Sequence, residues 1–539
     1  MAHTALRRSK RKELTVADIK IESLSFRYPD ANAYALRDLS LEIGDGELCV
    51  VMGDTGSGKS TLLRCLSASL SPKGERCGRI TLDGVDISSL SPADAAKKIG
   101  FVQQNPEHAI VTDKVYHELA FGLESIGASR EQMHRRVAEV ASYFGIDGLF
   151  ERDTATLSGG QKQLLCLACA VSTSPELLIL DEPTASLDPI AASELITAVK
   201  RLNADLGVTV IIVEHRLEEL IPICDRLIVL EGGALRYNAP PRRVVEQMRS
   251  DGASESLVLA LPTPTRLFLR HFPEKTDAAV PLSIKEARML RLESCEEQRH
   301  GPITSRQDIA IELDKVYFRY EKDSPDILRG LSLRAYKGEI VCIVGGNGSG
   351  KSTMLSVIAG LERPYAGKVH ILGNECFSRR RGLTCREDVG LVPQDVETLI
   401  IHDTVRRELS DATTWGNRLG LEPYYELNPY DLSGGQLQLL AFAKVLARRP
   451  RVLLLDEPTK GLDPQRKAML GEVLRELARD GVCIVIVSHD VEFCDTVADR
   501  IGLFFRGELL PPQNNEDFFR SNTFYTTARR KILAPRQNQ

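Results

Sequence analysis

The chain contains Gly53-Asp54-Thr55-Gly56-Ser57-Gly58-Lys59-Ser60-Thr61, and 292 residues further on it contains Gly345-Gly346-Asn347-Gly348-Ser349-Gly350-Lys351-Ser352-Thr353. Both stretches fit the pattern G-x-x-x-x-G-K-[ST], which is typical of a phosphate-binding loop. In such a loop, backbone N–H groups of a glycine-rich turn surround phosphate oxygens, and the following helix adds the positive end of its dipole. An apolar run precedes each loop and a helical run follows it, which is the context that the pattern requires. We therefore predict two nucleotide phosphate sites in one chain.

Each loop is followed by the same two motifs in the same order. The first is a Ser-Gly-Gly-Gln string, at Ser158-Gly159-Gly160-Gln161 and at Ser433-Gly434-Gly435-Gln436. The second is an apolar strand that ends in Asp-Glu, at Asp181-Glu182 and at Asp456-Glu457. The interval from Gln104 to Ser158 is 54 residues, whereas its counterpart beginning at Gln394 is 39 residues. The set of motifs is thus duplicated, and the segment between the Gln and the Ser-Gly-Gly-Gln string differs in length between the two copies.

Length and composition limit the classes of protein to which this chain can belong. A chain of 539 residues has room for two or more domains. Its 43% hydrophobic and 27% charged residues are ordinary for a globular protein, and a net charge of −5 gives no support for a nucleic-acid partner. No apolar run approaches the roughly 18 residues of a membrane-spanning helix. The basic run at residues 7–12 has no apolar segment behind it, which argues against a secretory signal and favours a solvated tail.

The twelve cysteines show no regular spacing. Cys166 and Cys169 form a C-x-x-C, but they lie within an apolar helical run. Such a pair is more typical of a helix core than of a redox or metal site. We expect reduced thiols in the cytoplasm and assign no cysteine-bound metal.

The hydrophobic pattern predicts an α/β fold in each copy. Short runs that are apolar at every position, such as Thr209 to Val213 and Cys483 to Val487, are typical of a buried, mostly parallel sheet covered by helices. Helical, charged stretches are expected around Lys114 to Ala141 and, shorter, around Thr404 to Leu421. Between the copies, prolines and mixed charges predict short helices joined by turns.

The predicted organisation is a basic tail at 1–17, a first domain at 18–240, a connecting segment at 241–306, a second domain at 307–512 and a C-terminal tail at 513–539. Phe518, Phe519, Phe524 and Tyr525 are candidates for docking that tail, which is otherwise expected to be partly disordered.

The residues around the loops suit the chemistry of a magnesium-bound nucleotide. Lys59 and Lys351 would supply positive charge to the β- and γ-phosphates, and the hydroxyls of Ser60 and Ser352 would ligate Mg²⁺. Asp181 and Asp456 end hydrophobic strands, a costly place for a carboxylate unless it meets a cation such as Mg²⁺. Glu182 and Glu457 follow on the opposite face of the strand end, where they are suited to polarise an attacking water as general bases. An alternative for these pairs is a simple cap or surface pair before Pro183 and Pro458.

In this position the Ser-Gly-Gly-Gln string resembles the signature of ATP-binding-cassette (ABC) ATPases. That resemblance covers nearly the whole chain apart from the connecting segment and the tails. It implies two tandem P-loop NTPase domains, each a RecA-like α/β core with an antiparallel β subdomain and a helical subdomain, and it implies ATP and Mg²⁺ as cofactors. Further residues match the family's motifs: the aromatic that stacks on adenine (Tyr28, Tyr320), the glutamine that senses Mg²⁺ and contacts the transmembrane partner (Gln104, Gln394), the aspartate of the loop after the catalytic glutamate (Asp188, Asp463) and the switch histidine (His215, His489).

In this family two cassettes pack head to tail, either within a chain or between chains. The resemblance thus implies that one ATP site joins Lys59, Glu182 and His215 to Ser433 and Gly435. The other would join Lys351, Glu457 and His489 to Ser158 and Gly160. Both sites look complete. One departure follows the switch histidine, where the first copy has Arg216 and the second has Asp490.

Several short strings of the sequence are similar to strings in the ATPases of energy-coupling-factor importers. The strings that carry this likeness are Phe26-Arg27-Tyr28-Pro29, Gln104-Asn105-Pro106-Glu107, Glu118-Leu119-Ala120-Phe121-Gly122, Leu261 to Arg266 and Pro281 to Ala287. The likeness implies two separate partners, a transmembrane scaffold subunit and a small membrane protein that binds the substrate, and a place on the cytoplasmic face of the membrane. Vitamins, vitamin precursors and transition-metal ions are all open as substrates.

Another class of fused cassettes stays open. Twin-cassette ATPases also act on ribosomes or, with zinc insertions, in DNA repair. The ribosomal type usually has a strongly charged helical hairpin, whereas residues 240–305 mix charges with prolines and apolar residues. The repair type would need more zinc-ligand pairs than one C-x-x-C within a helix.

Overall fold

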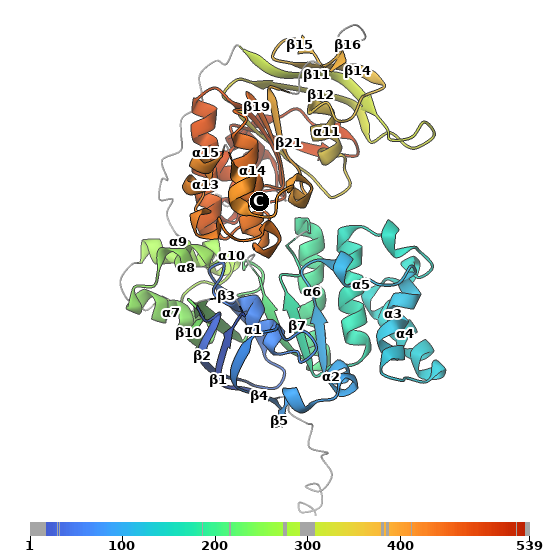
Figure 1. Cartoon of the computed structure of the whole chain (residues 1–539), viewed down its shortest axis with the longest axis vertical. Coiled ribbons are helices and arrows are strands. Elements are labelled where there is room, and N and C mark those ends of the chain that lie inside the picture. The colour runs from blue at the N-terminus through green and yellow to red at the C-terminus, as the bar shows by residue number, and fades with distance from the viewer. Residues whose placement is uncertain are drawn as a thin grey trace, which may run out of the picture. The chain divides into compact units, whose positions relative to one another are not determined.

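The computed structural model describes residues 18–533, apart from residues 30, 32, 186, 215–216, 273–277, 291–307, 379–381, 384–386, 411 and 524. The chain divides into two compact units, Met1–Ala287 and Arg288–Gln539, and each holds one full set of the repeated motifs (Figure 1). The predicted basic tail at 1–17 lies outside the described residues. The other predicted domain boundaries stay predictions.

The first unit is built on a six-stranded sheet in the order β10-β9-β3-β8-β7-β6. Its strands are β3 (Leu48–Gly53), β6 (Ile99–Val102), β7 (Leu177–Asp181), β8 (Thr209–Val213), β9 (Arg226–Glu231) and β10 (Ala234–Ala239). All are parallel except β10, which pairs antiparallel with β9. Every residue of β7 and β8 is buried, as expected for a parallel sheet covered on both faces. The strand predicted at Thr209 to Val213 is therefore confirmed.

Two smaller layers complete the first unit. One is an antiparallel sheet in the order β2-β1-β4-β5, with β1 (Ile19–Arg27), β2 (Leu36–Ile43), β4 (Glu75–Leu82) and β5 (Val85–Asp86). The helices are α1 (Lys59–Cys65), α2 (Pro92–Lys98), α3 (Val115–Ser125), α4 (Arg130–Phe144), α5 (Gly159–Ser172) and α6 (Pro189–Leu206). Helices α3, α4 and α5 form a helical group with its own apolar core (Figure 1). This is the helical subdomain that the ABC resemblance implies.

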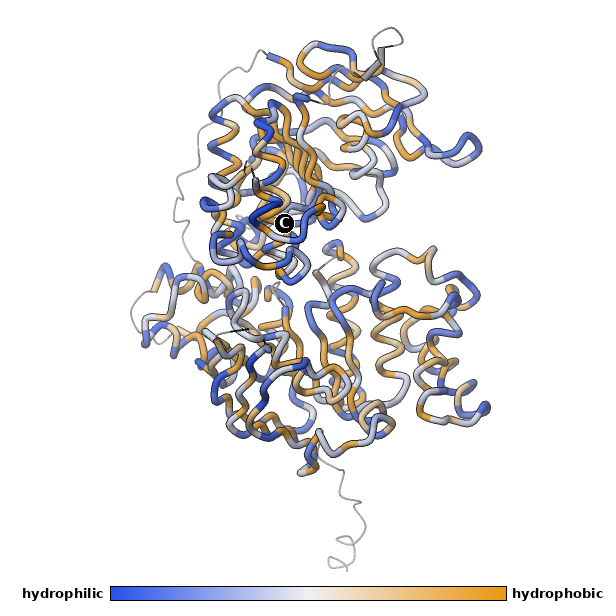
Figure 2. Tube along the Cα trace, in the orientation of Figure 1, coloured by the Kyte–Doolittle hydropathy of each residue, from blue (hydrophilic) through white to orange (hydrophobic). Residues whose placement is uncertain are grey.

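The second unit repeats this plan. Its main sheet runs β18-β19-β20-β13-β21-β22, with β23 also paired to β21, and its antiparallel sheet runs β12-β11-β14-β15. The strands are β11 (Ile309–Phe318), β12 (Leu328–Tyr336), β13 (Ile340–Val344), β14 (Ala366–Ile371), β15 (Asn374–Glu375), β16 (Phe377–Ser378), β17 (Gly382–Leu383), β18 (Val389–Val392), β19 (Val452–Asp456), β20 (Cys483–Val487), β21 (Arg500–Phe505), β22 (Glu508–Leu509) and β23 (Gln513–Asn514). The helices that cover them are α11 (Lys351–Ile358), α12 (Val405–Leu409), α13 (Thr413–Arg418), α14 (Gly434–Leu446), α15 (Pro464–Arg479) and α16 (Val491–Val497). Figure 2 shows the central strands of this unit as a continuous apolar band.

Each unit carries a helical extension beyond its last sheet strands. In the first unit this consists of α7 (Pro241–Asp251), α8 (Glu255–Ala260), α9 (Thr263–His271) and α10 (Ile284–Met289), which agrees with the short helices predicted between the copies. In the second unit it consists of α17 (Asn515–Ser521) and α18 (Ala528–Leu533). Phe518 and Phe519 are buried in the core of the second unit. Phe518 and Phe519 therefore dock the described part of the C-terminal tail, as their aromatic character predicted; Phe524 and residues 534–539 lie outside the described residues.

Candidate nucleotide site

The two phosphate loops have the same geometry. Each connects the end of a central strand to a helix that begins at the motif lysine, β3 to α1 and β13 to α11. Gly58 has φ of +94°, and a Cβ there would lie 2.4 Å from the carbonyl oxygen of Ala35, so this turn needs glycine. Lys59 Nζ donates to the carbonyls of Gly53 (2.8 Å) and Asp54 (2.9 Å), and Lys351 Nζ does the same to Gly345 (2.9 Å) and Gly346 (2.8 Å). Both lysines are buried, and their ammonium groups lie against the backbone of the loop.

A serine and an aspartate meet beside each loop. Ser60 Oγ donates to Asp181 Oδ1 at 3.0 Å, which joins the start of α1 to the end of β7. Burial raises the pKa of Asp181, and the neighbouring charge of Glu182 raises it further. Burial also raises the pKa of Asp456, whose bond with Ser352 acts in the opposite direction. Asp456 Oδ1 is buried without a hydrogen-bond partner in the described part of the chain. A hydroxyl and a carboxylate oxygen that lacks a partner are hard oxygen ligands, so the residues fit Mg²⁺.

The two predicted general bases share an uncommon backbone. Glu182 has φ of +45° and Glu457 has φ of +51°, in the left-handed region that non-glycine residues rarely adopt. Each N–H donates at 2.9 Å to the carbonyl of a neighbouring strand end, Val213 or Val487. Gln104 Nε2 donates to Glu182 Oε2 at 3.1 Å. Gln394 lies at the equivalent place, just beyond β18, and is exposed.

The switch histidine of the second unit is described in full. His489 is buried, its Nε2 lies 3.3 Å from Glu457 Oε1, and its backbone N–H donates to Glu457 Oε2 at 3.1 Å. The structure thus brings together two residues that are 32 positions apart in sequence. His215 and Arg216 lie outside the described residues. The residue before His215 was missed by the sequence analysis: Glu214 is buried and accepts from Thr184 N at 2.7 Å. A carboxylate at the end of an apolar strand was the signal that could have found it.

The Ser-Gly-Gly-Gln strings form the first turns of α5 and α14. Ser158 and Ser433 are N-caps, and each makes a reciprocal capping box with the glutamine three residues later. In the first unit the helix is tied to the Gln104 segment, since Gln163 Nε2 donates to Gln103 O at 3.1 Å and Lys162 pairs with Glu107. Asp188 and Asp463 are N-caps of α6 and α15. Their aspartate loops therefore begin the helices that follow the Asp-Glu strands.

The aromatic residues lie next to the loops. Tyr28 OH is 3.1 Å from Thr61 Oγ1, and Tyr320 OH is 3.2 Å from Thr353 Oγ1. The Tyr320 side chain is largely exposed, so its ring face is available to a base. The adenine-stacking role stays a prediction.

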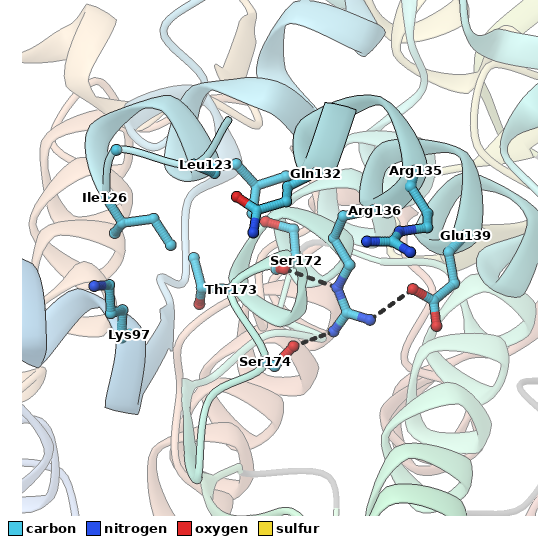
Figure 3. A pocket seen from close by; sticks show the side chains of 12 residues that line it. Lys97, Leu123, Ile126, Gln132, Arg135, Arg136, Glu139, Ser172, Thr173 and Ser174 are labelled. Atoms are coloured by element: carbon cyan, nitrogen blue, oxygen red, sulfur yellow. Dashed lines mark hydrogen bonds and ion pairs between the residues drawn. The ribbon is translucent and has the colours of Figure 1, made fainter. Parts of the chain in front are cut away.

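A surface hollow of about 410 Å³ lies at the other end of the signature helix α5 (Figure 3). Arg136 of α4 makes several contacts in this hollow. Its guanidinium donates to Ser172 O at 2.9 Å and to Ser174 Oγ, and it forms an ion pair with Glu139 at 2.8 Å. These bonds satisfy carbonyls at the C-terminal end of α5. The hollow contains none of the predicted nucleotide residues, and Arg136 has a structural role in holding α4 against α5.

Comparisons with known proteins agree with this geometry. A family profile described as "ABC transporter" matches residues 36–185 and 328–460, one stretch in each unit. The chain belongs to the ABC transporter family. A provisionally named ABC transporter ATP-binding protein of Bacillus thuringiensis is 39% identical, over 96% of both chains. A protein of Streptomyces coelicolor with the same provisional name is 36% identical, and the match covers 96% of this chain and 98% of the Streptomyces chain. The crystal structure of an archaeal ribosome recycling factor in complex with a stalk protein superposes with a TM-score of 0.59 at 22% identity, covering 91% of this chain and 90% of that one, which shows the fold alone.

Membership of this family establishes the coarse activity. The chain is a two-cassette ABC ATPase that binds ATP, normally with Mg²⁺, and hydrolyses it to ADP and phosphate. ABC ATP-binding proteins work with membrane components. Within its described ranges, the chain has no helix that combines the length and the apolar character needed to cross a bilayer.

Proposed function

We propose that this chain is the ATP-hydrolysing subunit of a membrane importer of the energy-coupling-factor type, placed on the cytoplasmic face of the membrane. The strings around Gln104 and Glu118 support this class, as do relatives named as transporter ATP-binding proteins. Its partners would be a transmembrane scaffold subunit and a small membrane protein that binds a vitamin, a vitamin precursor or a metal ion. The domains would be arranged as predicted, with cassettes at 18–240 and 307–512.

The observation that carries this proposal is an exposed apolar residue presented in the same way by both cassettes. Val111 and Ile401 each lie seven residues after the predicted Gln, with exposed fractions of 64% and 78%. A buried glutamate fixes the backbone at each: Glu118 accepts from Val111 N (3.2 Å) and Thr112 N (2.8 Å), and Glu408 accepts from the backbone N–H groups of Ile401 and His402. An outward apolar side chain on a fixed backbone, repeated twice, fits a surface made for an apolar partner.

Within each cassette the residues would take the roles that their positions suit. Lys59 and Lys351 would bind the phosphates, and Ser60, Ser352, Asp181 and Asp456 would hold Mg²⁺, with Gln104 and Gln394 nearby. The bound ion would neutralise charge on the phosphate oxygens. Glu182 and Glu457 would accept the proton of the attacking water, with His215 and His489 positioning the reacting groups. The complete sites would form head to tail, with Ser433 and Gly435 facing Lys59, and Ser158 and Gly160 facing Lys351.

The test is to isolate the tagged full-length chain from detergent-solubilised membranes of its own host. We expect a multi-span scaffold protein and a small membrane protein to co-purify. The double variant Val111→Asp/Ile401→Asp should lose both, because burying a charge in an apolar contact is costly. Val85→Asp, at an exposed valine in the antiparallel sheet, is the matched control and should keep them. Sedimentation of the chain with ribosomes, and with no membrane partner, would overturn the importer proposal in favour of the ribosomal class.

A further inference from the structure

A glutamate three residues after each switch histidine binds the first residue of a helix in the extension of the same cassette. In the first cassette, Glu218 Oε1 accepts from Thr263 N (2.8 Å) and from Thr263 Oγ1 (2.7 Å). In the second cassette, Glu492 Oε1 accepts from Ala528 N at 2.6 Å. Thr263 begins α9 and Ala528 begins α18. We call α9 and α18 the accessory helices.

The two bonds are equivalent in the fold although the sequences around them differ. Both glutamates follow a buried central strand and its histidine, β8 in one unit and β20 in the other. Both accept from the N–H of the first helical residue, a group that has no partner within its own helix. The same arrangement therefore occurs twice, once after each copy of the motifs.

Other contacts hold each accessory helix firmly in its own unit. In α9, Phe268 is fully buried and Thr265 Oγ1 donates to Pro281 O at 2.8 Å. In α18, Arg530 pairs with Asp495 of α16 at 2.7 Å and donates to Asn515 Oδ1 at 2.7 Å. The bonds to Glu218 and Glu492 are thus part of a packed contact and not an isolated surface interaction.

In the second cassette the contact leads directly to the predicted reaction centre. Glu492 is in the first turn of α16, and Asp490 caps that helix by accepting from Phe493 N at 3.0 Å. His489 immediately precedes the cap and lies against Glu457. Helix α16 thus lies between α18 and His489, so a displacement of α18 would be passed through α16 to the position of His489.

The first cassette has an additional contact, from its extension to the phosphate loop itself. Ser256 Oγ of α8 donates to Asp54 Oδ2 at 3.0 Å. The second loop has Gly346 at the place of Asp54, so it has no side chain there to form such a bond. The extension of the first cassette therefore contacts its phosphate loop as well as Glu218.

We propose that Glu492 is a positioning residue through which α18 controls the switch histidine His489 of its own cassette. ATP turnover in the second cassette would then require α18 to be docked. A partner protein that displaced α18 would slow hydrolysis there without touching ATP. This inference rests on the proposed roles of His489 and Glu457.

The test compares variants of the full-length chain at saturating ATP. Glu492→Ala removes the acceptor, and Ala528→Pro removes only the donor, since proline is well tolerated at the first position of a helix. Each should lower kcat roughly threefold to tenfold, as expected for coupling of this kind, with an unchanged KM for ATP. The double variant should be no slower than either single variant, because both remove one hydrogen bond. Glu492→Gln, which keeps an acceptor oxygen, should restore most of kcat.

Two results separate this inference from the function on which it rests. A lower melting temperature with unchanged kcat in Glu492→Ala and Ala528→Pro would show a purely structural contact and overturn the inference. His489→Ala is the independent arm, and it should reduce turnover severely. If it left turnover unchanged, the role of the histidine would be wrong, whatever the accessory helices do.

Discussion

Glu182 and Glu457 have the same left-handed backbone, at φ of +45° and +51°. Such a conformation costs a non-glycine residue about 1–3 kcal/mol and persists only where the surroundings enforce it. Here the enforcing contacts are the bonds from each N–H to Val213 O and Val487 O. In the first cassette Gln104 donates to Glu182, whereas the preceding Asp181 accepts from Ser60. The two adjacent carboxylates thus have different hydrogen-bond partners.

Replacing both glutamates by glutamine tests this division at the scale of the residue. Glu182→Gln/Glu457→Gln should reduce phosphate release about 100-fold or more, since a general base contributes at least that factor. ATP binding, measured with a fluorescent analogue, should be retained because Gln keeps the shape of the side chain. Glu131→Gln, at an exposed carboxyl of α4, serves as the control. Hydrolysis at the original rate in the double variant would refute the assignment of the bases.

At the scale of the element, the signature helices show why two successive glycines are not equivalent. A Cβ on Gly435 would lie 2.3 Å from the carbonyl oxygen of Gly461, in the loop that leads to Asp463. A Cβ on Gly434 would have no atom within 4 Å. The second glycine therefore lets α14 pack closely against that loop, while the first faces open space.

The pair Gly435→Ala and Gly434→Ala tests this packing. Gly435→Ala must push α14 or the loop aside, and overpacking of this kind costs about 1–3 kcal/mol, so the melting temperature should fall by several degrees. Gly434→Ala should leave it unchanged or raise it slightly, because alanine favours a helix over glycine. Thermal unfolding followed by circular dichroism measures both. Equal melting temperatures for the two variants would contradict the packing argument.

At the scale of the whole molecule, the two cassettes are complete but unequal. Between its Gln and its signature, the first has the long helices α3 and α4, whereas the second has the short helices α12 and α13. This is the segment that bears Val111 and Ile401, so the surfaces that we propose for a membrane partner lie beside helices of different length. The contacts of the extensions also differ at one position, because Ser256 Oγ donates to Asp54 of the first phosphate loop and the second loop has Gly346 at that place.

Head-to-tail pairing of the cassettes makes an asymmetric prediction. Ser433→Arg should impair the site built on Lys59 and spare the site built on Lys351, because the signature of one cassette would complete the site of the other. Photo-labelling with an azido-ATP analogue, followed by peptide mapping, distinguishes the two sites. Ser158→Arg is the reciprocal control and should reverse the pattern. Loss of labelling at Lys351 in the Ser433 variant would show that the pairing is wrong.

The sequence by itself determined the duplicated α/β cassettes and the identity of the phosphate loops, signatures and Asp-Glu strand ends. These features are local: a glycine turn, a capping box or a buried strand depends on residues within a few positions of one another. The length of the helix after the first loop was not determined in this way, since α1 ends at Cys65 and turns follow it, in which Leu70 N donates to Ser67 O. The hydroxyls of Ser67 and Ser69 lie 3.2 Å apart in these turns.

Only the tertiary structure decided how distant segments meet. The bond from Thr263 to Glu218 spans 45 residues, the one from Ala528 to Glu492 spans 36, and the docking of the C-terminal tail depends on where Phe518 and Phe519 find a core. No periodicity or motif encodes such contacts, because they depend on which surfaces remain free after each sheet and its helices have packed. The repeated motifs therefore predict two ATP sites, and the fold adds the contacts that join Glu218 and Glu492 to the accessory helices.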